Sequence, residues 1–473
     1  MTPLQPLWPG LTYFKHQVPA IQHMLLLERI GVTCSVKDHD DLTVYGGLLG
    51  DDMGLGKTIE MLATLRHNPK PKTLVLVPLA LVETWRVNAS KAGFCVALTG
   101  LSGKTKAWTK DPASVVTAPQ QIYLTNYETL LFHKELILSQ SWDRVVLDEA
   151  HRNRNPETAL TEEVFKIKAP IRWAMTGTPV VNRIKDAATL FAFIGVPHSP
   201  SMKWLPEYTD LIHELVIHRS MEEIRGIVPD VPPVPEVEEH VVEFLTHKER
   251  VFYDTAGLGE IPLVRLLRLR QASVSPATFD PTWKTPSTKM VALGDLIEEG
   301  GKKDKWLVFC SFHSEMELIS EYLQQRLKIE TEEYHGGLTA VERTEALDRA
   351  REPSCQVLLI QLQAGGVGLN LQEFNRVVFM SPWWTSAMMD QAVARAVRMG
   401  QKRVVKVIHL LIDHEKGMNI DKFMGSKAEE KRKILKQEFF KHRVDLTTKT
   451  KTKTKTTSDV PVKGVFLKRK AKA

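Results

Sequence analysis

The stretch from Gly50 to Thr58, Gly-Asp-Asp-Met-Gly-Leu-Gly-Lys-Thr, joins an apolar run to an amphipathic run. Tyr45 to Leu49 has the character of a buried strand, and the apolar residues after position 58 recur at helical spacing, so the turn should open onto a helix N-terminus. Glycines let backbone N–H groups close on phosphate oxygens, and the helix dipole favours an anion there. Lys57 would reach the β- and γ-phosphates of ATP, and the Thr58 hydroxyl would ligate Mg²⁺. The residues expected around the nucleotide here are Asp51, Asp52, Met53, Gly54, Leu55, Gly56, Lys57 and Thr58.

One position departs from the strictest form of this motif, G-x-x-x-x-G-K-[ST]. Asp51 stands where the first glycine belongs, and Gly50 lies one residue earlier. The alternative interpretation is an ordinary strand-to-helix turn with a solvated lysine. Partner motifs further along the chain favour the phosphate-binding interpretation.

An acidic pair, Asp148-Glu149, follows the apolar run 144–147 directly. In a nucleotide hydrolase Asp148 would hold Mg²⁺ through an ordered water, and Glu149 would polarise the attacking water. An acidic pair at a strand end can also be a solvated cap. Together with Lys57 and Thr58 in one α/β pattern, the pair favours hydrolysis.

Strands and helices alternate along the chain, which predicts an α/β fold with parallel sheets. In such sheets ligand-binding groups gather at the carboxyl ends of the strands. Runs with strand character occupy residues 45–49, 73–77, 144–147, 306–310 and 357–362.

These motifs together resemble the helicase-related ATPases of superfamily two, and specifically the Swi/Snf-type DNA translocases. The resemblance implies two RecA-like lobes, ATP and Mg²⁺ as cofactors, and double-stranded DNA as the partner. If these motifs are real, Gln17 would recognise adenine through paired hydrogen bonds, and otherwise it is a solvated helix residue. The run Arg172 to Pro179 would pass nucleotide state to the rest of the molecule, or it is an ordinary turn. The matching motifs are Gln17, GDDMGLGKT (50–58), LVLVP (74–78), TNYE (125–128), DEAH with R-x-x-N (148–155) and TGTP (176–179).

The second half of the family pattern is carried by the run 390–401, which matches Q-x-x-x-R-x-x-R-x-G-Q. Gln391, Arg395 and Arg398 are spaced by four and three, so on a helix they would share one face. Two guanidinium groups facing a cleft suit a triphosphate whose transferring group spreads charge over its oxygens. The same face could instead pair with surface acids.

Two further segments have implied roles in gripping DNA. The leucine- and arginine-rich run 263–271 looks like a helix that helps to hold DNA, although it could be an amphipathic surface helix. The glycine-rich segment 364–371 resembles a family loop whose backbone touches a DNA phosphate and the cleft between the lobes.

The domain organisation follows from a proline-marked linker, Val231 to Pro235. We expect a first RecA-like lobe over 1–225, a linker with helical insertion over 226–290, a second lobe over 291–425 and a basic disordered tail over 426–473.

Charge is concentrated in that tail, which has 16 Lys/Arg and 5 Asp/Glu, or +11, against a whole-chain net charge of +7. It is too poor in apolar residues to build a core. It would act as a nonspecific nucleic-acid tether or a nuclear-import patch, which favours the nucleus over the cytoplasm.

Composition excludes some classes of protein. There is no run of about 18 apolar residues, so no membrane span is expected. The four cysteines are dispersed, which argues against a zinc module. The runs 269–276 and 381–384 look most like the DNA-repair subgroup, whose members usually insert a RING between the lobes. No RING is present, so ubiquitin ligase activity is not supported.

The expected function is ATP-dependent translocation on double-stranded DNA, which remodels chromatin or displaces DNA-bound proteins, with DNA repair and nucleosomes as candidate role and substrate. Two alternatives remain open: an RNA or DNA strand-separating helicase, and a nucleotide-gated DNA-binding protein without turnover.

Overall fold

The computed structural model describes most of the chain. Outside the described part lie residues 1–2, 35–41, 99–120, 180–183, 197–208, 226, 229–230, 302, 366–368, 415–416, 435–465 and 468–473. The chain divides into two compact units, residues 1–229 with 434–473 and residues 230–433. The four domain limits given above remain predictions.

The first unit contains a sheet whose strands run in the order β15-β1-β2-β7-β6-β3-β5-β4, with β8 paired to β2. From β2 to β4 every neighbouring pair is parallel, and only β1 and β2 are antiparallel. The strands are β1 (Val32–Cys34), β2 (Leu42–Leu49), β3 (Lys72–Val77), β4 (Cys95–Leu98), β5 (Gln121–Asn126), β6 (Arg144–Asp148), β7 (Ile171–Met175), β8 (Val216–Ile217) and β15 (Phe466–Leu467).

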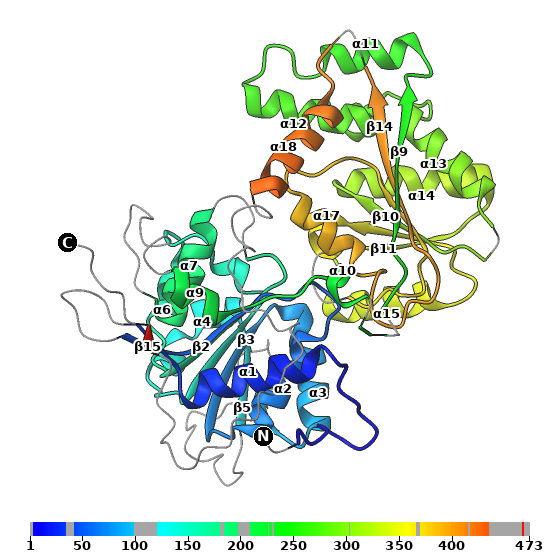
Figure 1. Cartoon of the computed structure of the whole chain (residues 1–473). Coiled ribbons are helices and arrows are strands. Elements are labelled where there is room, and N and C mark those ends of the chain that lie inside the picture. The colour runs from blue at the N-terminus through cyan, green and yellow to red at the C-terminus, as the bar shows by residue number, and fades with distance from the viewer. Residues whose placement is uncertain are drawn as a thin grey trace, which may run out of the picture. The chain divides into compact units, whose positions relative to one another are not determined.

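The helices of this unit flank the sheet (Figure 1). Strand β3 is buried almost throughout because helices cover both sides of a parallel sheet. The helices are α1 (Gln17–Arg29), α2 (Lys57–His67), α3 (Val82–Lys91), α4 (Tyr127–Phe132), α5 (Lys134–Leu138), α6 (Ala159–Phe165), α7 (Ile184–Ile194), α9 (Thr209–Leu215) and α10 (Met221–Ile224).

Strand register brings the predicted motifs to one edge of this sheet. Leu49 of β2 pairs with Met175 of β7, which in turn pairs with Asp148 of β6. The segments that follow these residues therefore emerge side by side, as expected for the carboxyl ends of parallel strands.

The second unit is built on a fully parallel sheet with the order β11-β12-β10-β13-β14-β9. Along β10 (Trp306–Cys310) the side chains alternate between two cores. Trp306 and Val308 pack on one face, and Leu307 and Phe309 on the other. The remaining strands are β9 (Glu236–Glu243), β11 (Thr331–Tyr334), β12 (Val357–Gln361), β13 (Arg376–Phe379) and β14 (Lys406–Asp413).

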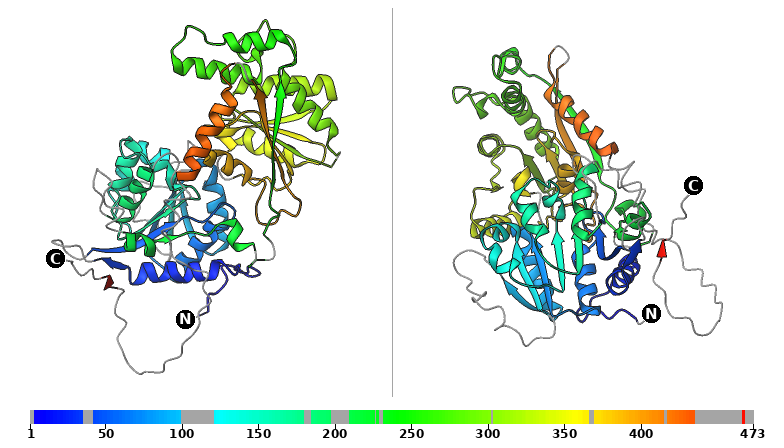
Figure 2. Two further views of the ribbon diagram at one scale, coloured as in Figure 1. Left: turned by 45° about the horizontal axis from the view of Figure 1, so that its top comes forward. Right: turned by 90° about the vertical axis from the view of Figure 1, so that its left-hand side faces the viewer.

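Helices supply the other half of both cores, and they lie on both sides of the sheet in the two views of Figure 2. The predicted α/β fold, with two RecA-like sets of parallel strands flanked by helices, is thus confirmed. The helices are α11 (His247–Thr255), α12 (Pro262–Val274), α13 (Thr288–Glu299), α14 (His313–Leu327), α15 (Ala340–Arg351), α16 (Leu362–Gly365), α17 (Ser386–Val393) and α18 (Ile420–Ile434).

Helix α18 crosses the predicted start of the tail at position 426, which stays a prediction. Helix α18 runs through position 426 to Ile434, and Met424 and Ala428 are buried in it. The helix continues because these apolar residues, four apart, share one face. Most of the remaining tail lies outside the described residues.

Candidate ATP site and arginine segment

The phosphate loop, residues 50–57, connects the end of β2 to the first residue of α2. Gly56 caps this helix with a φ of 88°, a conformation that side chains with a Cβ rarely adopt. A Cβ at Gly56 would also lie 2.5 Å from Nε2 of Gln17. The second glycine of the motif is therefore required both by its backbone angle and by space.

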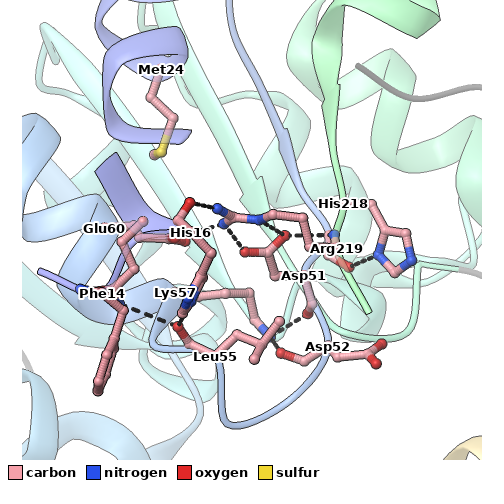
Figure 3. Close-up of polar contacts among 12 residues, drawn as sticks. Phe14, His16, Met24, Asp51, Asp52, Leu55, Lys57, Glu60, His218 and Arg219 are labelled. Carbon is pink, nitrogen blue, oxygen red and sulfur yellow. Dashed lines mark hydrogen bonds and ion pairs between the residues drawn. The ribbon is translucent and has the colours of Figure 1, made fainter. Parts of the chain in front are cut away.

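Lys57 lies folded over the loop that precedes it (Figure 3). Its Nζ donates to the carbonyl oxygen of Asp51 at 2.7 Å and to that of Asp52 at 3.3 Å. A Cβ built on Gly177, just after β7, would lie 3.4 Å from the same Nζ. The ammonium group is thus placed between the loop and the end of β7, where a phosphate would compete with the two carbonyls for it.

Gln17, at the start of α1, is buried against the phosphate loop. Its Nε2 donates to the carbonyl of Leu55 at 3.2 Å, and its Oε1 accepts from the N–H of Phe14 at 3.0 Å. Nε2 of His16 lies 3.0 Å from the same Leu55 carbonyl. The amide therefore supports the loop, and its predicted recognition of adenine stays a prediction.

Asp148 is held at the end of β6 by groups that the sequence did not single out as functional. Nε1 of Trp85 donates to its Oδ2 at 2.7 Å, and the hydroxyl of Tyr127 donates to its carbonyl at 2.6 Å. Burial, and then the neighbouring Glu149, raise the pKa of Asp148 to about 6. A buried carboxylate of this kind suits a group that holds a cation.

Glu149 adopts the left-handed backbone conformation, with φ 49° and ψ 48°. For a residue with a Cβ this costs about 1 kcal/mol, and such strain is concentrated at functional sites. Its Oε2 lies 3.4 Å from Nδ1 of His151, which lies 3.1 Å from Oγ1 of Thr176. His151 thus connects the acidic pair to the run after β7, while the transmission of nucleotide state remains a prediction.

The two aspartates of the loop do not face a ligand with their carboxylates. Asp51 is fully buried and is bonded by Arg219, and Oδ2 of Asp52 accepts from the N–H of Met221 at 2.8 Å. Their contribution to a nucleotide would come from the backbone. Arg219 was not predicted, because it lies 168 positions from Asp51 in the chain.

The oxygen groups predicted to ligate Mg²⁺ lie on two elements of this unit. Thr58 offers a hydroxyl in the first turn of α2, and Asp148 offers a carboxylate at the end of β6. Lys57 acts electrostatically on Asp148, so the loop and the strand end face the same region. Hard oxygen donors fit Mg²⁺, which would neutralise phosphate charge there.

In the second unit we define the arginine segment as residues 394–401. The prediction that Gln391, Arg395 and Arg398 share one helix face is wrong, because α17 ends at Val393 and only Gln391 lies on it. Two residues after the helix ends, the Arg395 carbonyl accepts from the N–H of Leu371 at 3.0 Å.

Arg398 contacts the same neighbouring segment, since its Nη1 donates to the Leu369 carbonyl at 3.1 Å. The arginine segment therefore packs against the end of the predicted glycine-rich segment 364–371. Residues 366–368 of that segment lie outside the described part of the chain.

Two arginines of α12 are engaged within the protein. Arg270 is buried, lies 4.7 Å from the ring centroid of Trp383 and donates to Ser311 Oγ at 3.1 Å. Arg268 lies 5.0 Å from the ring centroid of Phe279. A role for this helix in holding DNA stays a prediction.

Within the part of the chain that the structure describes, one other cluster of polar side chains has metal-ligand character, at His313, Glu333 and His335. Nδ1 of His335 accepts from the N–H of Gly337, and its Nε2 lies 3.1 Å from Nε2 of His313. Nδ1 of His313 lies 3.1 Å from the carboxylate of Glu317. A chain of ordinary hydrogen bonds accounts for this cluster, since each ring then donates from one nitrogen and accepts with the other.

Comparisons with known proteins match both units. A model of the SNF2-related domain matches residues 16–220, and a model of the helicase conserved C-terminal domain matches residues 288–400. Within the described residues, no helix is long and apolar enough to span a membrane.

Individual relatives are distant. A probable global transactivator of Orgyia pseudotsugata multicapsid polyhedrosis virus is 28% identical over 476 residues, which cover 90% of this chain and 91% of that protein. Chromodomain-helicase-DNA-binding protein 1-like of Danio rerio is 29% identical over 415 residues, 77% of this chain but 40% of that protein. A Sulfolobus solfataricus SWI2/SNF2 ATPase core in complex with double-stranded DNA has 23% identity and a TM-score of 0.41, covering 92% of this chain and 96% of that one. That score is too low to carry an argument.

Proposed function

This chain belongs to the Snf2-type ATPases of helicase superfamily two, and from that premise we propose that it uses ATP hydrolysis to move along double-stranded DNA. The observation that carries the proposal is the convergence of Lys57 and Asp148 at one sheet edge of an SNF2-related domain, followed in the chain by a helicase C-terminal domain. A motor of this kind needs both parts, because hydrolysis in one must be coupled to a second DNA-holding body.

The proposed roles divide between the two units. Lys57 would neutralise the β- and γ-phosphates, Thr58 and Asp148 would hold Mg²⁺, and Glu149 would polarise the attacking water. From the second unit Arg395 and Arg398 would stabilise the charge of the transferring phosphoryl group. Gln391 and Gln17 would complete the nucleotide contacts.

The substrate we propose is intact duplex DNA bearing a bound protein, and nucleosomes are the first such substrate to test. The Danio rerio relative is named a chromodomain-helicase-DNA-binding protein, which supports a chromatin role and a nuclear location. A part in DNA repair rests on the resemblance of runs 269–276 and 381–384 alone.

The first experiment compares steady-state ATPase rates with free duplex DNA, nucleosomes, single-stranded DNA and RNA. We expect stimulation by duplex DNA and none by RNA. Stimulation by RNA in place of duplex DNA would favour an RNA helicase, and ATP binding without DNA-stimulated turnover would favour a nucleotide-gated binding protein.

A second experiment tests movement itself. We expect ATP-dependent displacement of the third strand from a DNA triplex, and no separation of a forked duplex under the same conditions. Glu149→Gln serves as the control without hydrolysis. Fork unwinding by the native chain that is lost in this variant would assign a strand-separating helicase instead.

A further inference from the structure

Asp51 occupies the place of the first glycine in the strict phosphate-loop motif, and its side chain is fully buried. Its Oδ1 accepts from the backbone N–H of Arg219 at 2.8 Å and from Nε of the same residue at 3.1 Å. Nη2 of Arg219 bonds the other carboxylate oxygen (Figure 3). The strict motif has glycine at this position, whereas here both carboxylate oxygens of Asp51 are hydrogen-bonded to Arg219.

The same guanidinium reaches two further elements. Its Nη2 donates to Oε1 of Glu60 on α2 at 2.6 Å, and its Nη1 donates to the carbonyl of His16 just before α1. Arg219 is 4% exposed and Glu60 is fully buried, so these contacts are shielded from solvent screening. One side chain therefore ties the loop to the helices on either side of it.

The backbone around Arg219 also runs along the start of the loop. The N–H of Gly50 donates to the Ile217 carbonyl at 2.7 Å, and the N–H of Asp52 donates to the Arg219 carbonyl at 3.0 Å. Nδ1 of His218 lies 2.7 Å from the Gly50 carbonyl. The first three residues of the loop are thus hydrogen-bonded to the segment 217–219.

The charges in this network balance. Although burial opposes it, Arg219 holds the pKa of Asp51 below its usual value. Burial raises the pKa of Glu60 to about 8, so near neutral pH Glu60 is largely protonated and Asp51 alone offsets the guanidinium. The positive charge left for a phosphate is then that of Lys57, and Arg219 is not itself suited to bind the nucleotide.

We propose that Arg219 is a positioning residue of the ATP site, which sets the phosphate loop through Asp51 and so places the two carbonyls that hold Lys57. Nζ of Lys57 donates to the carbonyls of Asp51 and Asp52, the two residues that Arg219 grips by side chain and by backbone. A shift of the Asp51 carboxylate therefore moves the lysine. This inference rests on the ATPase activity and is independent of the track along which the protein moves.

The matched control is Arg144, the other fully buried arginine paired with a carboxylate in this unit. It lies at the opposite end of β6 from Asp148, where it bonds Glu28, and it donates to the Asn68 carbonyl at 2.7 Å. Arg144→Gln breaks a buried ion pair of similar kind without touching the loop. It reports what loss of stability alone does to the kinetics.

The experiment measures KM for ATP, kcat, the affinity for a fluorescent ATP analogue and the melting temperature in Arg219→Gln, Arg219→Lys and Arg144→Gln. We expect all three to melt earlier, and only the Arg219 variants to raise KM and weaken analogue binding at a temperature where each is folded. A misplaced catalytic group typically costs about 100-fold, so we expect kcat/KM to fall between tenfold and about 100-fold.

Arg219→Lys keeps the proposal testable if Arg219→Gln does not fold. Lysine keeps a positive charge for the buried carboxylates but cannot bridge Asp51, Glu60 and the His16 carbonyl at once. Unchanged KM and analogue affinity in folded Arg219→Lys, with a stability loss like that of Arg144→Gln, would overturn the proposal. Failure of the native chain to hydrolyse ATP would instead overturn the proposed function.

Discussion

The phosphate loop of the first unit and the arginine segment of the second are held in different ways. Side chains from two other parts of the chain grip the loop: Gln17 bonds Leu55, and Arg219 bonds Asp51. The arginine segment follows the end of a helix, and its contacts with the neighbouring segment reach the carbonyl of Leu369 and the N–H of Leu371.

The difference indicates a division of labour between binding and chemistry. A loop fixed by buried side chains is prepared to receive a nucleotide before it arrives, which lowers the cost of binding. The arginine segment is anchored within its own unit, since Ala396 and Val397 are buried in that unit's core and Nε2 of Gln401 donates to the Gln372 carbonyl at 2.7 Å. Its arginines are proposed to act on the charge of the transferring phosphoryl group and not on the fit of the loop. We therefore expect changes in the loop to alter ATP affinity, and changes in the arginine segment to alter turnover alone.

The largest expected effect comes from Lys57→Ala. Removing the ammonium leaves the phosphate charge without its principal cation, so we expect turnover to be abolished and ATP affinity to fall. Steady-state hydrolysis and equilibrium binding of a fluorescent analogue measure the two losses. Unchanged hydrolysis would show that this loop is not the ATP-binding site.

Next in size are Arg395→Ala and Arg398→Ala. Loss of an arginine that stabilises the transferring phosphoryl group typically lowers kcat by about 10³-fold or more, and we expect analogue binding to stay intact. Arg403→Ala is the control, because Arg403 follows the segment and its guanidinium donates to the backbone carbonyls of Lys303 and Glu373. If the Arg395 and Arg398 variants lowered only the melting temperature and left kcat unchanged, these arginines would be ordinary surface ion-pair residues. The proposed division between ATP binding and chemistry would then fail.

A smaller loss is expected for Glu149→Gln, which keeps the size of the side chain and removes its basic group. General-base groups contribute about 10² to 10⁴-fold, so hydrolysis should become slow while ATP still binds. Single-turnover hydrolysis and analogue affinity separate the two quantities. An equal loss of hydrolysis and of ATP affinity would show that Glu149 has a structural role.

The smallest expected effect is on the pH dependence of folding stability, through the proton on Glu60. The Glu60 carboxyl group faces Arg219, Asp51 and Lys57. Its pKa is near 4.5 in a free chain and about 8 in the folded protein. Between these values the folded state binds a proton that the unfolded state has lost, so stability falls as pH rises, by at most about 1.4 kcal/mol per pH unit. Glu60→Gln should flatten this part of the melting-temperature profile, and parallel profiles would show that Glu60 is ionised throughout.

The sequence predicted those features that depend on neighbours in the chain. Glycine spacing around Lys57 predicted the loop, and apolar runs predicted β3, β6 and β10 to within a residue or two. It missed the features that depend on distant contacts. Arg219 is 168 positions from Asp51, and the indole of Trp85 is 63 positions from Asp148.

The end of α17 is another feature that the sequence pattern did not predict. Spacing alone continues the helix to Arg398, whereas the helix ends at Val393 and the residues after it contact the distant Leu369 and Leu371. For Gln17 the bonds to Leu55 and Phe14 were not predicted, and its recognition of adenine stays a prediction.

The clamp on Asp51 also constrains how this sequence can change over generations. A mutation of Asp51 to glycine would leave the Arg219 guanidinium beside the protonated Glu60 alone, and a mutation of Arg219 would leave the buried Asp51 carboxylate without its cation. Each first step is costly, because an unpaired charge is then buried. Among related sequences, positions 51 and 219 should therefore be inherited as a pair, and an ancestor that exchanged one would have had to exchange the other soon after.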